Sequence, residues 1–310
     1  RDTRFFPRDS YRDGSQFIAD ELRACGWLRG RVGLEYWAMR PNPAVSERTK
    51  ASFEAAGAEV VDGSAIMREL RWIKSAAEMA CMEEAARIAE AGMRAASEII
   101  QPGMSELEVQ GEVLRALSSE GGEMPAMMLP VISGRKSNAT HAVSTRKQLR
   151  QGETLFIDLC GVHKRYHVNV ARTFSLGEAD DDVKNCASLA AGVMQVLRDC
   201  LRPNLPVNEL NERVMAYYQQ QGLWQSRGWI GGYEMGIAFF SDWVGNFVYD
   251  PLAEKNAHRC FQAGNVVNHE SQIFLPRFLG QYFMIESLLF YEDRVDLASP
   301  GISYDLIVIE

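Results

Sequence analysis

Residues 154–174, TLFIDLCGVHKRYHVNVARTF, form two largely apolar runs that a few polar side chains interrupt. Their β-branched and aromatic content and their alternation predict two strands. Asp158 lies inside the first run, where a carboxylate is costly to bury unless a partner, a ligand or a metal ion receives it. Strand alternation puts His167 and Asn169 on one face of the second strand and Arg172 on the other. We therefore expect Asn169 to face Asp158 in a polar site.

Two more carboxylates interrupt apolar sequence near the end of the chain. Glu270 lies in VVNHESQIF and Glu286 in YFMIESLLF, and both runs read as strands. A single buried acid is usually a satisfied structural group. Asp158, Glu270 and Glu286 are three such acids in predicted strands, and together they indicate a shared pocket.

Composition limits the classes of protein to consider. The 310 residues are 46% hydrophobic and 24% charged, which is typical of a globular protein. The net charge of -8, without a basic stripe, argues against nucleic acid as a partner. The apolar runs are far shorter than the ~20 residues that cross a bilayer, so no membrane segment is expected. The 6 cysteines are spread singly, which favours reduced thiols and a cytoplasmic protein.

The chain divides into two predicted domains. Residues 1–70 alternate helix and strand but contain too few strands for a self-sufficient domain, so they are expected to be the rear part of a larger α/β domain. Residues 71–310 begin with a long helix, which Ser75 and Glu78 start with a capping box, and Ser105 and Glu108 repeat this signature at the start of the next helix. Helix pairs then alternate with groups of strands, which predicts an α+β domain.

Several ordered motifs together resemble one known family, the creatinase, aminopeptidase P and methionine aminopeptidase group. The matching stretches are Lys74-Ser-Ala-Ala-Glu78, Ser137-Asn-Ala-Thr-His141, Asp158, Tyr166 to Phe174, Gly232-Tyr-Glu-Met-Gly236, Glu270 and Glu286. The resemblance implies the pita-bread fold for residues 71–310, a creatinase-type N-terminal α/β domain for residues 1–70, and a homodimer.

The resemblance also raises the question of whether the chain binds metal ions. Metallopeptidases of this group bind two metal ions through Asp, Asp, His, Glu and Glu. Here the second aspartate position is Asn169 and the histidine position is Tyr233, a neutral amide and a protonated phenol. We therefore expect no metal cofactor. A single Mn, Fe or Zn ion stays open as an alternative, and its expected ligands are Asp158, Glu270, Glu286 and His167.

Creatinase-like members of the group hydrolyse a carbon–nitrogen bond without metal and have a histidine at the place of His141. An imidazole with a pKa near ~6.5 can take a proton from water and return it to a leaving nitrogen. In this interpretation His141 is the general acid/base, and Glu270 and Glu286 orient a cationic nitrogen. Tyr233 donates to the tetrahedral centre and Asp158 positions water.

The run Trp229–Asp250 interleaves aromatic and acidic residues, and Gly236 to Trp243 is similar to ectoine hydrolases. Aromatic faces beside carboxylates bind compact cations, so a small cationic or zwitterionic substrate is predicted. Core or dimer packing is the other explanation of these rings. The candidate substrate-binding residues are Asp158, Asn169, Arg172, Glu234, Phe239, Asp242 and Trp243.

Two other functions stay open at this point. One is a metal-dependent enzyme, either an Xaa-Pro-type dipeptidase or a lyase similar to those that cleave dimethylsulfoniopropionate. The other is a non-catalytic binding protein of the same fold. His141 and the buried acids argue against the second, because buried acids are costly to retain without a use.

Overall fold

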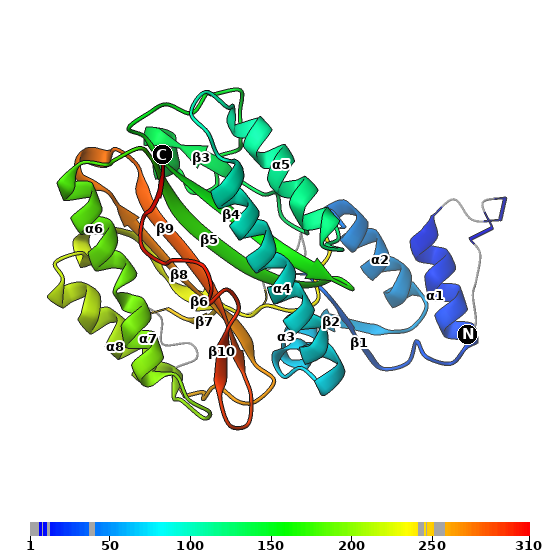
Figure 1. Cartoon of the computed structure of the whole chain (residues 1–310). Helices are drawn as coiled ribbons and strands as arrows, with labels where there is room; N and C mark the ends of the chain where they lie inside the picture. Colours follow the sequence, from blue (N-terminus) through cyan, green and yellow to red (C-terminus); the bar gives the residue numbers. More distant parts are fainter. Residues whose placement is uncertain are drawn as a thin grey trace. The chain divides into compact units, whose positions relative to one another are not determined.

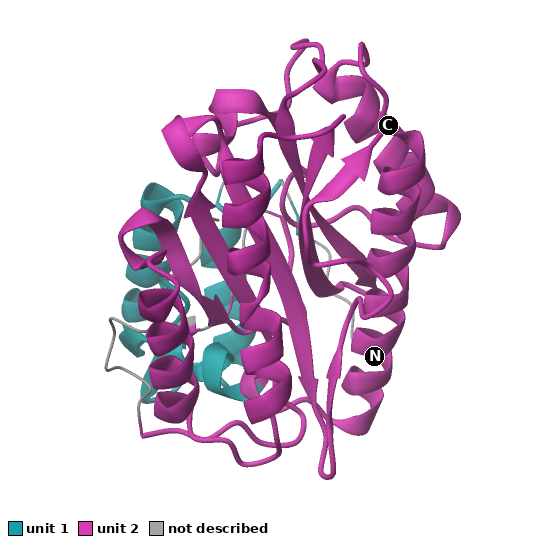
Figure 2. Cartoon of the chain, turned by 60° about the vertical axis from the view of Figure 1, so that its left-hand side comes forward, with its two compact units in different colours: residues 1–70 teal, residues 71–310 magenta. Residues whose placement is uncertain are grey.

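The computed structural model describes residues 6–7, 9–10, 13–36, 41–240, 245, 247–250 and 258–310. The chain divides into two compact units, residues 1–70 and 71–310 (Figure 2). No helix within the described ranges is both long enough and apolar enough to cross a membrane.

The first unit alternates helix and strand, as its sequence predicts. Its elements are α1 (Gly14–Ala24), β1 (Arg31–Leu34), α2 (Pro43–Ala55), β2 (Glu59–Asp62) and α3 (Ser64–Trp72), the last of which runs into the second unit. Strands β1 and β2 pair in parallel. A small cluster of buried residues, Ala19, Leu28, Phe53 and Ala58, forms its core. That this unit is the rear part of a larger domain stays a prediction.

Within its described residues, the second unit is built on one nine-stranded sheet. Its helices are α4 (Ala76–Ile99), α5 (Glu106–Ser119), η1 (Gly134–Asn138), α6 (Asp181–Ala191), α7 (Val193–Cys200), α8 (Val207–Gln220), η2 (Trp224–Ser226) and η3 (Pro276–Phe278). Its strands are β3 (Val131–Ser133), β4 (Thr154–His163), β5 (Tyr166–Leu176), β6 (Arg227–Tyr233), β7 (Phe247–Tyr249), β8 (Val266–Phe274), β9 (Gln281–Phe290), β10 (Val295–Leu297) and β11 (Ile307–Ile309). The strand order is β3-β4-β5-β9-β8-β6-β7, with β10 on β9 and β11 on β5. The predicted α+β class is confirmed.

The helix boundaries follow local sequence signals. Ser75 and Ser105 start α4 and α5, and each forms the predicted capping box with the glutamate three residues later. The sequence predicts one helix from about 179 to 201, but the structure has two, α6 and α7, that meet at Gly192. A Cβ at Gly192 would lie 2.0 Å from the hydroxyl of Tyr217, so a larger residue at this junction requires the tyrosine side chain to move.

Helices cover one face of the sheet. Helices α4 and α5 lie over β4 and β5, and α6, α7 and α8 lie over β8 and β9 (Figure 1). Gly161 of β4 lets α4 approach closely, since a Cβ there would lie 1.9 Å from the carbonyl oxygen of Ala85. The covered face carries aliphatic and aromatic side chains such as Ile157, Val170 and Met284. We call it the helix-covered face.

The register of the strands fixes which side chains share the opposite face. Asp158 of β4 lies opposite Ala171 of β5, Ala171 lies opposite Ile285 of β9, and Ile285 lies opposite Glu270 of β8. Because side chains alternate along a strand, these residues and Asn169 all project from the same face. We call it the site face. Buried Phe156 and Phe283 extend it as an apolar patch.

Candidate active site

Asp158 and Asn169 meet on the site face, as the alternation predicts. The side-chain nitrogen Nδ2 of Asn169 donates to Oδ1 of Asp158 at 2.6 Å. The carboxyl of Asp158 is buried, and burial raises its pKa to about 7, although the bond from Asn169 opposes the shift. Asp158 is therefore an acid that takes up a proton close to neutral pH.

Tyr233 contacts the same amide from β6. Its hydroxyl donates to Oδ1 of Asn169 at 3.3 Å, and its backbone N–H donates to Oδ1 of Asn268 at 2.8 Å. Burial, and then the negative charges of Glu270 and Asp158, hold the pKa of the phenol well above its ordinary value. Tyr233 is therefore a neutral hydrogen-bond donor in this site.

Glu270 completes the buried cluster from β8. It accepts a hydrogen bond from Nε2 of Gln272, and the hydroxyl of Tyr233, which has a single hydrogen, can donate either to Glu270 or to Asn169. Burial, with a smaller contribution from the neighbouring charge of Asp158, raises the pKa of Glu270 to about 8, although the bond from Gln272 opposes the shift. The described partners of both acids are neutral, so the site face holds two desolvated carboxyl groups that favour a cation.

His141 lies on the segment that follows η1, and its side chain is exposed. The preceding residue ties this segment to the cluster: Oγ1 of Thr140 donates to Oε1 of Gln272 at 3.0 Å, and Gln272 donates to Glu270. The structure therefore brings the His141 segment to the edge of the acidic cluster, by which we mean Asp158, Glu270 and their neutral neighbours Asn169 and Tyr233.

The placement of Glu286 and Arg172 corrects the sequence interpretation. Glu286 lies opposite His269 and projects from the helix-covered face, as does Arg172. Nη2 of Arg172 donates to Oε2 of Glu286 at 2.7 Å, and both side chains are fully buried. Ser299 donates to the same carboxylate through Oγ at 2.6 Å and through its backbone at 2.8 Å. Neither residue reaches the site, so neither orients nor binds a substrate there.

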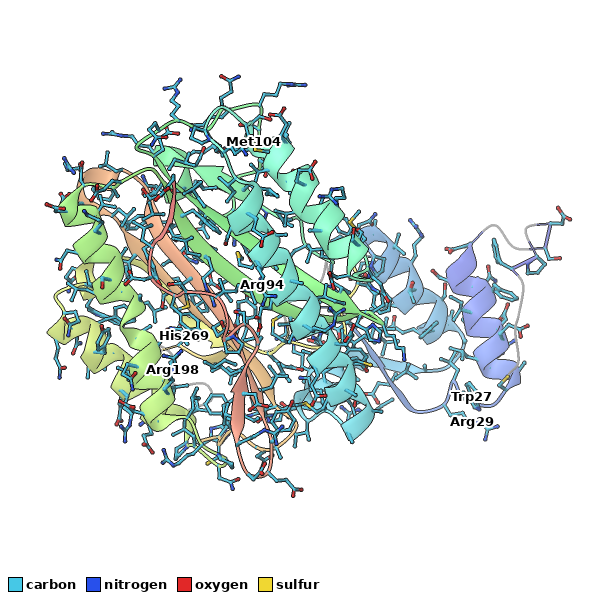
Figure 3. The ribbon with its side chains drawn as sticks, viewed as in Figure 1. Trp27, Arg29, Arg94, Met104, Arg198 and His269 are labelled. Atoms are coloured by element: carbon cyan, nitrogen blue, oxygen red, sulfur yellow. The ribbon has the colours of Figure 1, made fainter. Side chains whose placement is uncertain are left out.

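His167 is also wrong as a metal ligand. It lies on the site face, but both ring nitrogens are engaged: Nε2 accepts the backbone N–H of Ala126 at 2.9 Å and Nδ1 donates to the carbonyl of Arg165 at 2.9 Å. Burial lowers the pKa of His167 to about 4, so the ring is neutral and structural. His269, labelled in Figure 3, projects from the helix-covered face, where Nε2 lies 2.8 Å from Oγ of Ser271.

The substrate-binding candidates Glu234 and Phe239, from the aromatic run 229–250, lie in different surroundings. Glu234 is buried and forms an ion pair with Lys74 at 3.0 Å, so its charge is already compensated. Phe239 is exposed, and its ring centroid lies 5.8 Å from the guanidinium carbon of Arg165. The prediction of Glu234 as a substrate ligand is corrected by its ion pair. Asp242 and Trp243 lie outside the described residues.

The sequence interpretation missed four residues of the cluster. Asn268 and Gln272 flank Glu270 at alternate positions of β8, Cys160 lies two residues beyond Asp158, and Ile285 faces Glu270. The alternation around each recognised acid was a signal for the first three. Ile285 depends on the register between distant strands, which no local pattern reveals.

The donor set does not fit the metal pair that the resemblance implies. Two carboxyls, Asp158 and Glu270, remain on the site face, while Asn169 offers a neutral amide, Tyr233 a protonated phenol and Ile285 no donor. Nδ2 of Asn169 moreover points a hydrogen at Asp158, where a metal would need a lone pair. Within the described ranges no group of three or more His, Cys, Asp and Glu side chains is placed to hold a metal ion.

Comparisons with known proteins place the chain among peptidases and hydrolases. An uncharacterized peptidase, YqhT, of Bacillus subtilis is 25% identical over 84% of this chain and 70% of its own length. An Xaa-Pro dipeptidase of Pyrococcus horikoshii is 25% identical over 69% of this chain and 59% of its own. The ectoine hydrolase of Halomonas elongata is 28% identical over 70% of this chain and 56% of its own. The chain thus spans little more than half the length of the last two.

Solved structures share the fold. An X-Pro aminopeptidase of Thermotoga maritima superposes with a TM-score of 0.75 at 18% identity, over 96% of this chain and 80% of that one. A recombinant prolidase of Thermococcus sibiricus gives 0.80 at 17% identity, over 97% and 78%. The predicted pita-bread fold is confirmed. The model of metallopeptidase family M24 matches residues 80–295. The chain therefore belongs to metallopeptidase family M24.

Proposed function

We propose that this chain is a hydrolase that cleaves a non-peptide carbon–nitrogen bond of a small cationic or zwitterionic compound, without a metal ion. The relatives include an ectoine hydrolase and several peptidases, and the peptide bond that a peptidase cleaves is a carbon–nitrogen bond. We further propose that the protein is a cytoplasmic homodimer whose substrate is a small molecule.

One observation carries the proposal. Asp158 and Glu270 are buried together on the site face, and their described hydrogen-bond partners are the neutral side chains of Asn169, Gln272 and Tyr233. Burying a carboxylate without a counter-charge is unfavourable, so the cluster favours a ligand that supplies positive charge. A cationic nitrogen of the substrate meets that requirement.

The residues support a hydrolytic step in which the proton balance closes. His141 takes one proton from water as the water oxygen bonds to the carbon, and returns it to the nitrogen as the carbon–nitrogen bond breaks. The neutral hydroxyl of Tyr233 donates to the oxygen or nitrogen that gains charge at the tetrahedral centre. Glu270 orients the cationic group, and Asp158 holds the attacking water.

The dipeptidase names among the relatives favour a second candidate, a metal-dependent Xaa-Pro-type dipeptidase. The neutral amide of Asn169, the protonated phenol of Tyr233 and the alkyl side chain of Ile285 argue against this candidate, because they are poor metal ligands or none. Activity on an Xaa-Pro dipeptide that requires added manganese, iron or zinc would establish this candidate and refute the metal-free hydrolase.

The first experiment screens creatine-like and ectoine-like compounds with chelator-treated protein and quantifies metal by plasma mass spectrometry. We expect turnover with far less than one equivalent of metal, and a loss of about 100-fold or more in His141→Ala. His163→Ala, a histidine at the end of β4, is the matched control and keeps its activity. Near-full turnover by His141→Ala would refute the assigned role.

A further inference from the structure

A buried carboxylate holds both ends of the segment that carries His141. Glu106, the first residue of α5, is 0% exposed. Its Oε1 atom accepts from the backbone N–H of Ser133 at 3.0 Å and from the hydroxyl of Ser133 at 2.8 Å. Its Oε2 atom accepts from the backbone N–H and from the hydroxyl of Thr145, both at 2.9 Å. One carboxylate therefore closes a loop that begins at Ser133 and ends at Thr145.

Lys136 ties the interior of the same loop to this carboxylate. Its Nζ atom donates to Oε2 of Glu106 and, at 3.1 Å, to the carbonyl oxygen of Val143. Burial raises the pKa of the Glu106 carboxyl, but the bonds from Lys136 and from the two loop ends outweigh burial and lower this pKa below its ordinary value. Glu106 is therefore ionised at neutral pH, and bonds to an ionised acceptor are stronger than bonds between neutral groups.

His141 lies inside this loop and depends on it for its position. Its side chain is exposed, and its imidazole has no hydrogen-bond partner among the described residues. Thr140, on one side, donates to Gln272, and Ala142, on the other side, is half-buried against the apolar patch of the site face. An imidazole without a bond of its own is placed by its backbone alone. The groups that fix the loop therefore fix His141.

We propose that Glu106 is a positioning residue for the reaction and acts by holding His141 at the edge of the acidic cluster. The inference rests on the proposed function, since that function assigns the proton transfer to His141. Glu106 is fully buried and its two oxygens are engaged by the loop, so its effect on turnover passes through His141. A displacement of about 1 Å at a reacting group can cost about 100-fold in rate, so a small shift of the loop is sufficient.

The test uses variants of the intact chain that loosen the loop and leave the acidic cluster unchanged. Glu106→Gln removes the charge, and either orientation of the amide turns its nitrogen toward an N–H donor. Thr145→Val removes one hydroxyl donor, whereas Thr145→Ser keeps it. Glu108→Gln is the matched control, because Glu108 lies in the same first turn of α5 and its carboxylate accepts from Ser105, outside the loop. Circular dichroism verifies that each variant is folded.

Hydrogen exchange read by mass spectrometry measures the loop directly and needs no substrate. We expect the backbone amides of residues 134–145 to exchange about tenfold faster or more in Glu106→Gln than in the wild type. They exchange faster in Thr145→Val than in Thr145→Ser, and within about twofold of the wild type in Glu108→Gln. Unchanged exchange in Glu106→Gln overturns this inference without affecting the proposed function.

Turnover of the substrate that the screen identifies tests whether the loop acts through His141. The kcat of Glu106→Gln is expected to fall about 10- to 100-fold while KM stays within about threefold, since the acids that recognise charge are untouched. Thr145→Ser restores the turnover that Thr145→Val loses. In a His141→Ala background Glu106→Gln causes no further loss, because both changes remove the same contribution.

The outcomes separate this inference from the proposed function. An unchanged kcat in Glu106→Gln, or the same fold-loss of kcat with and without His141, overturns the positioning role alone, because a merely structural residue lowers kcat in both backgrounds. Near-full turnover by His141→Ala overturns the role that the proposed function gives to His141 and this inference with it. Absence of turnover of every screened compound by the wild type also overturns both.

Discussion

Glu270 and Glu286 occupy neighbouring strands of one sheet in opposite electrostatic surroundings. Glu270 is desolvated among neutral donors on the site face, whereas Glu286 pairs with Arg172 on the helix-covered face. The consequences for stability differ accordingly. Removing the charge of Glu270 relieves a desolvation penalty, whereas removing the charge of Glu286 leaves the buried cation of Arg172 without a counter-charge.

The first prediction concerns Glu270 and pH. Its pKa rises from 4.5 to about 8 on folding, so between these values the folded chain binds more protons than the unfolded chain. Its stabilising contribution is fully present below about pH 4.5 and is lost as the pH rises through 8. Thermal unfolding of the wild type is expected to shift to lower temperature from pH 5 to pH 8. Glu270→Gln flattens this decline, leaving the part due to Asp158, and an unchanged slope would contradict the shift.

The second prediction concerns Glu286. Glu286→Gln is expected to lower the free energy of unfolding by about 3 to 5 kcal/mol near neutral pH, because it leaves the fully buried Arg172 uncompensated. Urea unfolding measures the change. Cation binding to the folded variant stays as in the wild type. Glu292→Gln, in an exposed position after β9, is the control and changes stability little. A loss below 1 kcal/mol for Glu286→Gln would show that the pair matters less than its burial implies.

At the scale of elements, the contact between β4 and α4 depends on one missing side chain. A Cβ at Gly161 would lie 1.9 Å from the carbonyl oxygen of Ala85 and 2.5 Å from the nitrogen of Ala89. Gly161→Ala is expected to cost about 3 kcal/mol or more, since helix or strand must shift. Gly111→Ala, in α5 with open space around it, is expected to gain about 0.5 to 1 kcal/mol. Similar unfolding midpoints for both variants would contradict the close packing.

Local signals were sufficient for most elements and for half of the site. Capping boxes located the starts of α4 and α5, and alternation placed Asn169 opposite Asp158. Both depend on residues close together in the chain. The face of a side chain within its own strand is a local property and is therefore predictable.

The register between strands that are distant in the chain could not be predicted from the sequence. Whether Ile285 or Glu286 faces the acids depends on how β9 pairs with β5 and β8, and a shift of one residue exchanges the two faces. The local sequence around an acid in an apolar strand is the same whether the acid binds a ligand or an internal arginine. For Glu286 the arginine was the partner, and for Glu234 it was Lys74.

At the scale of the whole molecule, the buried apolar residues form separate cores. The small cluster around Phe53 belongs to residues 1–70, whereas residues 71–310 contain two large clusters and one small one. A core of a few residues provides little stabilisation. The first unit is therefore expected to unfold at a lower temperature than the second.

Differential scanning calorimetry tests this prediction. The intact chain is expected to show a minor transition below a major one, and residues 64–310, which keep α3 whole, are expected to show the major transition alone. A single transition in the intact chain that disappears on truncation would contradict independent cores.

The raised pKa of Glu270 also makes ligand binding a source of protons. At pH 7 a group whose pKa is about 8 is mostly protonated, and a cation that settles beside it favours the ionised form. The released proton passes to the buffer, so the heat measured on binding contains the ionisation enthalpy of the buffer. Apparent binding enthalpies in phosphate and in Tris then differ, while the affinity at a fixed pH stays the same. The buried carboxyl turns recognition of a cation into an acidification of the surrounding solution.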